Sequence, residues 1–230
     1  MLLYVGLDDT DNHDSRGTGR LARTIAETLA ADFRLLGVTR HQLLVDPRVP
    51  YTSHNSSACV LLEADTPPDL AALFARVRAL MLADFQPGSD PGLCVAAAGI
   101  PPEVQRFGAR AKTEVVDQAE ARQLAGRLNL LLAGLGGTEG GVIGALAAVG
   151  LGAGGEDGRY LLVGRTRELS GLQPVEAVLA AGIHEIRTAE GQPVTAGPVL
   201  ADKLRPARRA SRPVQFVAWQ EDRWLPLKLD

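Results

Sequence analysis

Four aspartates stand close together near the start of the chain. Asp8, Asp9, Asp11 and Asp14 lie within seven residues, shortly after the apolar run of residues 2–5. Carboxylates this close repel one another, and the simplest compensation is a hard cation with oxygen ligands, such as Mg²⁺ shared with substrate phosphates. We therefore predict a metal site formed by Asp8, Asp9 and Asp11, which we also expect to be catalytic.

Local chemistry offers a second interpretation of this cluster. Asp and Asn cap helices and form turns, so an Asp-rich loop between a strand and a helix can be purely structural. A turn needs one or two such residues rather than four, which favours the metal site.

A glycine-rich stretch, residues 134–141, is the second candidate for chemistry. Backbone N–H groups of glycines can surround an anion, and the start of a helix adds a favourable dipole. The spacing matches neither a Walker A loop nor a Rossmann fingerprint. We predict that Gly136, Gly137, Gly140 and Gly141 bind phosphates, and that the small residues after them form a helix packed close to a sheet.

Apolar periodicity predicts the elements that position these residues. The spacing of apolar residues from Leu21 to Phe33 predicts a helix after the aspartates, and residues 2–5 predict a buried strand before them. Further strands are predicted at 35–45, 58–62, 93–98, 159–164, 183–186, 213–219 and 224–229, and helices at 70–81, 101–133 (in two pieces), 142–150 and 174–181. This pattern predicts an α/β fold of the mixed α+β type, with a sheet covered by helices and a smaller C-terminal β-containing portion.

Composition limits the class of protein. The hydrophobic share of 46% is ordinary for a globular protein, and no apolar run approaches the roughly 20 residues that cross a bilayer. The first residues lack the basic region and cleavage site of a signal peptide, so we expect a cytoplasmic protein with no membrane partner. Cys59 and Cys94 stand in apolar runs and are expected to be core residues.

The net charge of −3 argues against a protein that coats nucleic acid over its whole surface. A local basic segment nevertheless exists at residues 203–212, with Lys203, Arg205, Arg208, Arg209 and Arg212. Both a solvated connection and a nucleic-acid contact are consistent with this segment.

Four segments occur in the order found in one known family. They are GLDDTD at 6–11, SRG at 15–17, DPRVPY at 46–51 and IGALAAVG at 143–150. Over residues 1–165 the chain thereby resembles the archaeal tRNA(Ile) 2-agmatinylcytidine synthetase family. That family uses ATP to phosphorylate the wobble cytidine of a tRNA, and agmatine then displaces the phosphate. The resemblance implies a kinase-like core at 1–168, with a ferredoxin-like insertion around 58–133, and a small region at 169–230; we expect the family's OB-fold and zinc ribbon to be lacking.

The resemblance also implies roles for single residues. Asp8, Asp9 and Asp11 would hold magnesium and position ATP, with Thr10 close to the phosphates. Asp90 corresponds to an Asn/Asp-Pro-Gly loop beside the site. Thr18 stands where the family has a Cys-Thr-Thr run that includes a phosphorylated threonine. Apart from the resemblance, we also expect Arg16, Gly17, His54 and Asn55 to bind the cofactor, with Arg16, Arg20 or His54 offsetting the charge of the transferred group.

Three hypotheses follow. The first is an ATP- and Mg²⁺-dependent phosphotransferase- or ligase-like enzyme, whose phosphate acceptor is a tRNA or a small molecule. The second is a non-catalytic module that binds a nucleotide or another anion. The third is an RNA-binding protein that uses residues 203–212. A homo-oligomer is compatible with all three.

Overall fold

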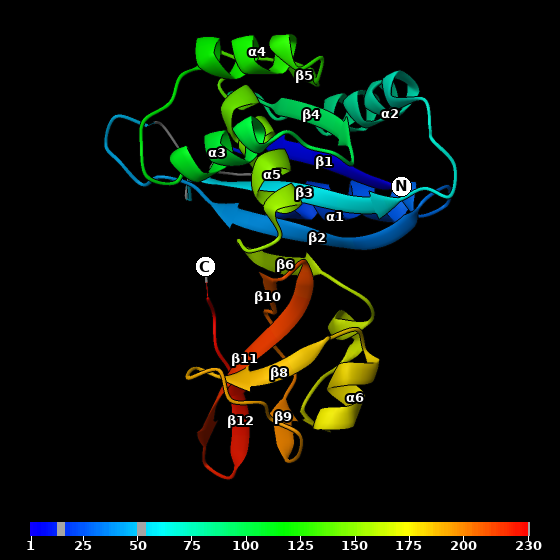
Figure 1. The fold of residues 1–230 in the computed structure, drawn as a ribbon, viewed down its shortest axis with the longest axis vertical. Helices are drawn as coiled ribbons and strands as arrows, with labels where there is room; N and C mark the ends of the chain where they lie inside the picture. The colour runs from blue at the N-terminus through cyan, green and yellow to red at the C-terminus, as the bar shows by residue number, and fades with distance from the viewer. Residues whose placement is uncertain (13–16, 50–53, 230) are drawn as a thin grey trace. The chain divides into compact units, whose positions relative to one another are not determined.

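The computed structural model describes residues 1–12, 17–49 and 54–229 (Figure 1). Within these ranges the chain forms six α-helices and twelve β-strands, so the predicted mixed α+β fold class is confirmed. The contacts divide the chain into two compact units, unit 1 (Met1–Gly154) and unit 2 (Gly155–Asp230). The domain boundaries drawn from the sequence stay a prediction, because a division by contacts does not test which segments fold alone.

Unit 1 is built on a five-stranded antiparallel sheet with the order β5-β4-β1-β3-β2, so β1 lies at its centre. Its elements are, in chain order, β1 (Leu2–Asp8), α1 (Thr18–Leu29), β2 (Arg34–Gln42), β3 (Ser56–Glu63), α2 (Leu70–Ala83), β4 (Gly92–Ala97), α3 (Pro102–Arg110), α4 (Gln118–Arg127), β5 (Leu131–Gly134) and α5 (Val142–Gly154).

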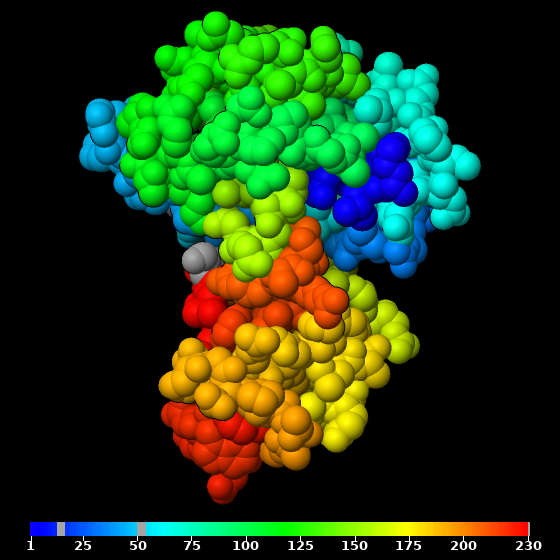
Figure 2. All heavy atoms as spheres, in the orientation of Figure 1, coloured from blue at the N-terminus to red at the C-terminus, as the bar shows by residue number. Residues whose placement is uncertain are grey.

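Helices cover both faces of this sheet. Helices α1 and α2 pack on one face, while α5 packs on the other, together with α3 and α4 (Figure 1). The apolar side of α1 is buried at the predicted spacing, with Leu21, Ile25 and Leu29 at most 7% exposed. In the space-filling view, residues of α3 and α4 (green) cover much of the drawn face of unit 1 (Figure 2). The apolar periodicity of the sequence thus predicted the packing of α1.

Helix α5 approaches the sheet at backbone distance. A Cβ added to Gly6, in the middle of β1, would lie 2.0 Å from the carbonyl oxygen of Ala145. On the other side of the helix, a Cβ at Gly150 would lie 2.1 Å from the carbonyl oxygen of Val104 in α3. The predicted close packing of this small-residue helix is therefore confirmed, and it depends on glycines in both partners.

The end of the helical stretch predicted at 101–133 was wrong, because residues 131–133 belong to a strand. Helix α4 ends at Arg127, Asn129 adopts a positive φ of 53°, and the chain then forms β5, which pairs with β4. Leu131 and Leu132 are apolar neighbours that suit a strand as well as a helix, and pairing with β4 decides between them.

Unit 2 is a small sheet with one helix. Its strand order is β6-β10-β11-β12-β9-β7, and β8 pairs with β11 in parallel. Its elements are β6 (Arg159–Leu162), the 3₁₀ helix η1 (Thr166–Glu168), β7 (Leu172–Pro174), α6 (Val175–Ala180), β8 (Glu185–Thr188), β9 (Pro198–Leu200), β10 (Ala207–Arg209), β11 (Arg212–Gln220) and β12 (Arg223–Pro226).

The basic segment 203–212 contains a strand that the sequence did not predict, β10. Arg208 on this strand is only 5% exposed, and its Nη1 donates to the hydroxyl of Tyr160 (2.6 Å) and the carbonyl of Ser211 (3.1 Å). Arg208 therefore has structural contacts inside unit 2.

None of the helices that the structure describes combines the length and apolar character needed to cross a bilayer. The cellular compartment stays a prediction.

The close approach of α5 to β1 makes Gly6 a sensitive position. We expect Gly6→Ala to lower the free energy of unfolding by roughly 3 kcal/mol, because the new methyl group must displace helix backbone. Gly126→Ala is the matched control: no atom lies within 4 Å of its added Cβ, and Ala in helix α4 should stabilise by about 0.5–1 kcal/mol. Urea unfolding of both variants measures the difference, and a Gly6→Ala protein as stable as the parent would contradict the close contact.

Candidate functional site

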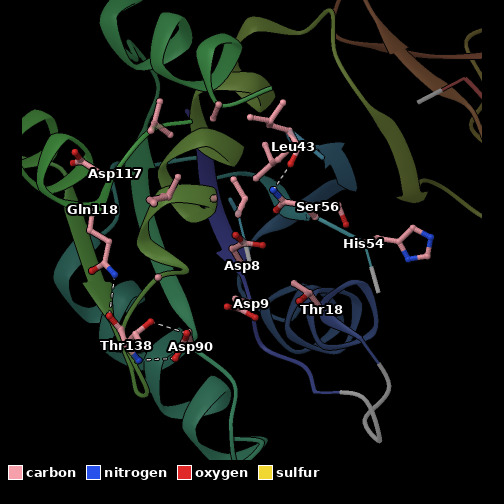
Figure 3. A pocket seen from close by; sticks show the side chains of 18 of the residues that line it. Asp8, Asp9, Thr18, Leu43, His54, Ser56, Asp90, Asp117, Gln118 and Thr138 are labelled. Carbon is pink, nitrogen blue, oxygen red and sulfur yellow. Dashed lines mark hydrogen bonds between the residues drawn. The ribbon is translucent and has the colours of Figure 1, made fainter. Parts of the chain in front are cut away.

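A cavity of about 320 Å³ opens in unit 1 where β1 ends and α5 begins (Figure 3). Its wall is assembled from segments that are distant in the sequence. Eight of the residues singled out from the sequence line it: Asp8, Asp9, Asp11, Thr18, His54, Asn55, Asp90 and Gly140. The structure therefore brings the aspartate cluster, the polar loop before β3 and the glycine-rich stretch to one place.

Asp8 is the last residue of β1, and the start of α5 covers its carboxyl group. A Cβ at Gly144 would lie 1.8 Å from Asp8 Oδ2, so only glycine leaves room there. Burial raises the pKa of Asp8 to about 8, and the charge of Asp9 adds to the rise. The pKa of Asp9 is raised to about 6, first by burial and then by the charges of Asp90 and Asp11. Both adjacent carboxyl groups are thus harder to ionise than an ordinary aspartate, and a bound divalent cation would favour their ionised forms.

The oxygen donors at this position fit a hard cation that phosphate oxygens complete. Mg²⁺ is usually held by one or two carboxylates, with waters and substrate phosphates at its other positions, and Asp8 and Asp9 supply that number. Across residues 1–12, 17–49 and 54–229 the structure contains no group of three His, Cys, Asp or Glu side chains placed to hold a metal ion. The geometry therefore suits a cation shared with a phosphorylated ligand better than a site made of protein ligands alone.

Asp11 is engaged with the first residue of α1. Thr18 Oγ1 donates to Asp11 Oδ1 (2.9 Å) and accepts from both the backbone N–H (3.3 Å) and the hydroxyl (3.1 Å) of Thr10. Gly17 precedes the helix with a φ of 76°, a backbone conformation that favours glycine. Thr10 is buried behind Thr18, and neither Thr10 nor Gly17 lines the cavity.

The charged side chains that line the cavity are almost all acidic. They are Asp8, Asp9, Asp11, Asp90, Glu114 and Asp117. Among the described lining residues, His54, which is exposed, is the one that can carry a positive charge. Because like charges repel, a polyphosphate would enter this cavity only together with cations.

The glycine-rich stretch holds a protein carboxylate. The backbone N–H of Thr138 donates to Asp90 Oδ1 (2.6 Å), and the Thr138 hydroxyl donates to Asp90 Oδ2 (2.7 Å). Gly141 N donates to the carbonyl oxygen of Asp90 (2.9 Å). The Asp90 carboxylate thus occupies the kind of anion position that we predicted for a phosphate.

The glycines around Thr138 allow this contact. Gly137 has a φ of 59°, and a Cβ there would lie 1.8 Å from Asp90 Oδ1. A Cβ at Gly136 would lie 2.6 Å from the ring of Phe85. Of the four glycines predicted to bind phosphate, Gly140 lines the cavity, whereas Gly136, Gly137 and Gly141 do not.

Asn55 lines the cavity and also shapes it. Its side-chain Nδ2 donates to the backbone carbonyl oxygen of Leu44 (2.7 Å), and its backbone carbonyl oxygen accepts from Leu43 N (2.8 Å). Of the other residues predicted for the site, Arg20 does not line this cavity, and Arg16 lies outside the described residues.

Sequence reasoning missed one wall of the cavity. Its apolar side is formed by Leu43, Leu44, Val49, Ala111, Val116 and Ile143. Gln118 at the start of α4 donates from Nε2 to the carbonyl oxygen of Thr138 (2.9 Å), and Asp117 caps the same helix by accepting from Glu120 N (2.8 Å). Asp117 could have been recognised in the sequence as a residue that caps a helix. The residues of the apolar wall come from separate segments that share no sequence pattern.

No family model matches the chain, and no curated protein matches it. Solved structures do. The chain is similar to TiaS in its complex with an isoleucine tRNA and ATP (TM-score 0.58, 26% identity) and to a tRNA fluorescent labelling enzyme (TM-score 0.58, 27% identity). It is also similar to TiaS in its complex with the same tRNA, AMPCPP and agmatine (TM-score 0.56, 26% identity).

Each of these matches covers 65% of this chain and 36% of the other. The chain therefore has a partial TiaS-like fold and spans little more than a third of the proteins it matches. Apo TiaS, described as an agmatidine synthetase of that isoleucine tRNA, matches over the same share of this chain. The resemblance found in the sequence motifs is confirmed at the level of the fold.

The raised pKa of Asp8 predicts a pH-dependent effect of neutralising it. The folded protein favours the protonated carboxyl up to about pH 8, whereas the unfolded chain loses the proton near 3.8, so ionisation of Asp8 destabilises the fold as pH rises through that window. In metal-free buffer, Asp8→Asn should match the parent at pH 4 and exceed its unfolding free energy by about 2 kcal/mol or more at pH 8.

Urea unfolding at both pH values, with EDTA present, measures this difference. Asp65→Asn, an exposed position outside the cavity, is the control and should stay close to the parent at both pH values. An Asp8→Asn protein without any gain at pH 8 would show that the carboxyl is not desolvated.

Proposed function

We propose that the cavity of unit 1 binds ATP together with Mg²⁺, and that the chain is a phosphotransferase- or ligase-like enzyme with a tRNA-associated role. One observation carries this proposal: Asp8 and Asp9 are adjacent, partly buried carboxyl groups with raised pKa values, and they line an open cavity whose other charged side chains are almost all acidic. A divalent cation would stabilise their ionised forms, and phosphate oxygens would complete its coordination.

The cavity offers distinct surroundings for the two ends of a nucleotide. The carboxylates of Asp8 and Asp9 lie at the end of β1, while Leu43, Val116 and Ile143 belong to an apolar side that suits a nucleobase. Its volume of about 320 Å³ lies within the range of small-molecule sites. Magnesium, when bound, would supply the charge that allows the phosphates to approach the acidic wall.

Similarity supports the identity of the ligands. The TiaS structures that resemble this chain are complexes with an isoleucine tRNA and with ATP or AMPCPP. Because the chain spans 36% of those proteins, their complete reaction is a proposal here. The phosphate acceptor, whether a tRNA or a small molecule, is part of the same proposal.

Thr18 is a candidate nucleophile within this site. Its hydroxyl donates to Asp11 Oδ1 at 2.9 Å, the geometry of a nucleophile beside a general base. In the proposed step the Thr18 oxygen bonds to the γ-phosphorus of ATP, its proton passes to Asp11, and ADP leaves.

Mg²⁺ should be required for ATP binding. We expect calorimetry to show saturable ATP binding with Mg²⁺, and Asp8→Asn/Asp9→Asn should weaken it by about tenfold or more because the cation loses both carboxylates. Asp65→Asn is the control and should bind as the parent does. Equal affinity with Mg²⁺ and with EDTA would contradict the proposed role of the cation.

Phosphorylation of Thr18 has its own readout. After incubation with ATP and Mg²⁺, mass spectrometry should find a phosphate on Thr18, and Thr18→Val should lose it whereas Thr18→Ser should keep it, because serine retains the hydroxyl. A phosphate that persists in Thr18→Val would exclude Thr18 as the residue that becomes phosphorylated.

A non-catalytic nucleotide-binding module is the second candidate. It is favoured by the contact of Thr138 N with Asp90, which leaves that N–H unavailable for a phosphate. Release of ADP or AMP, measured with and without tRNA, separates the two: binding without release in either case supports the module.

A further inference from the structure

Unit 2 contains a cavity of its own, of about 330 Å³. Its wall comes from β6, η1 and residues 201–206. Four cationic side chains line it, Arg159, Arg167, Lys203 and Arg205, against the single carboxylate of Asp202. The sign of its charge is therefore opposite to that of the cavity in unit 1.

Hydrogen bonds to the neighbouring strands hold the cationic segment in place. Arg205 N donates to Oε1 of Gln215 (2.8 Å), and the Gln215 side chain in β11 is fully buried. Tyr160 N in β6 donates to the carbonyl oxygen of Pro206 (2.7 Å). The backbone that carries these cations is thus held in place, which reduces the conformational entropy that the protein loses when a ligand binds.

Most of this positive charge is not neutralised within the described chain. The side chains of Arg167, Lys203 and Arg205 form no ion pair with any carboxylate in residues 1–12, 17–49 and 54–229. Asp202 Oδ1 accepts the backbone N–H of Gly171 (2.9 Å). Cations gathered around a cavity without acidic partners raise the local concentration of anions.

The lining favours recognition of phosphate over recognition of a base. Tyr160 is its one aromatic residue among those described, and this side chain is 5% exposed. The Arg208 guanidinium lies over the ring, with Cζ 5.9 Å from the centroid. The ring is therefore not open for a base to stack on it, whereas the cationic side chains that line the cavity suit an anionic group.

We propose that the unit 2 cavity binds phosphate groups, supplied either by an RNA backbone or by a free polyphosphate. This site lies outside the proposed ATP site and depends neither on the carboxylates of unit 1 nor on Mg²⁺. The ligand is recognised by charge, so its binding weakens with salt.

Two charge-reversal variants test the proposal. Arg167→Glu/Lys203→Glu changes two exposed cavity residues, whereas Arg212→Glu/Lys228→Glu changes two exposed residues of unit 2 that do not line the cavity. Both variants have the same net charge, and Arg212 belongs to the same basic segment as Lys203. The pair therefore separates the cavity from overall charge and from the segment as a whole.

Binding of a fluorescent tRNA transcript and of tripolyphosphate is measured in magnesium-free buffer at several salt concentrations. For whichever of the two probes binds the parent protein, the affinity of the cavity variant should fall about tenfold. The slope of log K against log salt should fall by about two units in this variant. The control variant should lose less than about threefold in affinity. Loss for RNA identifies a nucleic-acid backbone, and loss for tripolyphosphate alone identifies a free phosphate ligand.

Three results would overturn the proposal: no binding of either probe to the parent protein, equal losses in the two variants, or an unchanged affinity in the cavity variant. Melting curves of both variants verify that unit 2 remains folded, as the exposure of the four substituted side chains leads us to expect.

Discussion

The candidate site depends on how closely the backbone of α5 approaches the central strand of unit 1. Gly6 in β1 lies against the carbonyl of Ala145, and Gly144 leaves room for the Asp8 carboxyl under the first turn of the helix. This contact shields Asp8 from water on the side of the helix, and burial is the main reason for its raised pKa. A helix with larger side chains would stand farther from the sheet and leave the same carboxyl hydrated.

The same constraint explains why the glycine-rich stretch precedes α5. To bring the helix so near the end of β1, the chain must pass close to β4, where a Cβ at Gly92 would lie 2.0 Å from the backbone of Gly141. The stretch then binds Asp90 through Thr138, which adds another acidic group to the cavity and raises the pKa of Asp9. The glycines here therefore allow close backbone packing, and the charged group bound beside them is the carboxylate of Asp90.

The net charge of −3 conceals a strong separation of charge along the chain. The cavity of unit 1 is lined by acidic groups, while that of unit 2 is lined mainly by arginine and lysine. An acidic cavity needs a cation before a phosphate group can approach it, whereas a basic cavity does not.

Local sequence determined the elements whose periodicity is unambiguous and the acidic cluster that is contiguous in the chain. β1, α1 and α2 follow from apolar spacing, and Asp8, Asp9 and Asp11 could be recognised because they are neighbours in sequence. Only the tertiary structure decided that Leu131 and Leu132 form a strand, because pairing with β4 outweighs a pattern that fits either element. It also decided what the glycines face and which residues complete the cavity, since Thr138, Gln118 and the apolar wall meet only after segments distant in sequence have packed together.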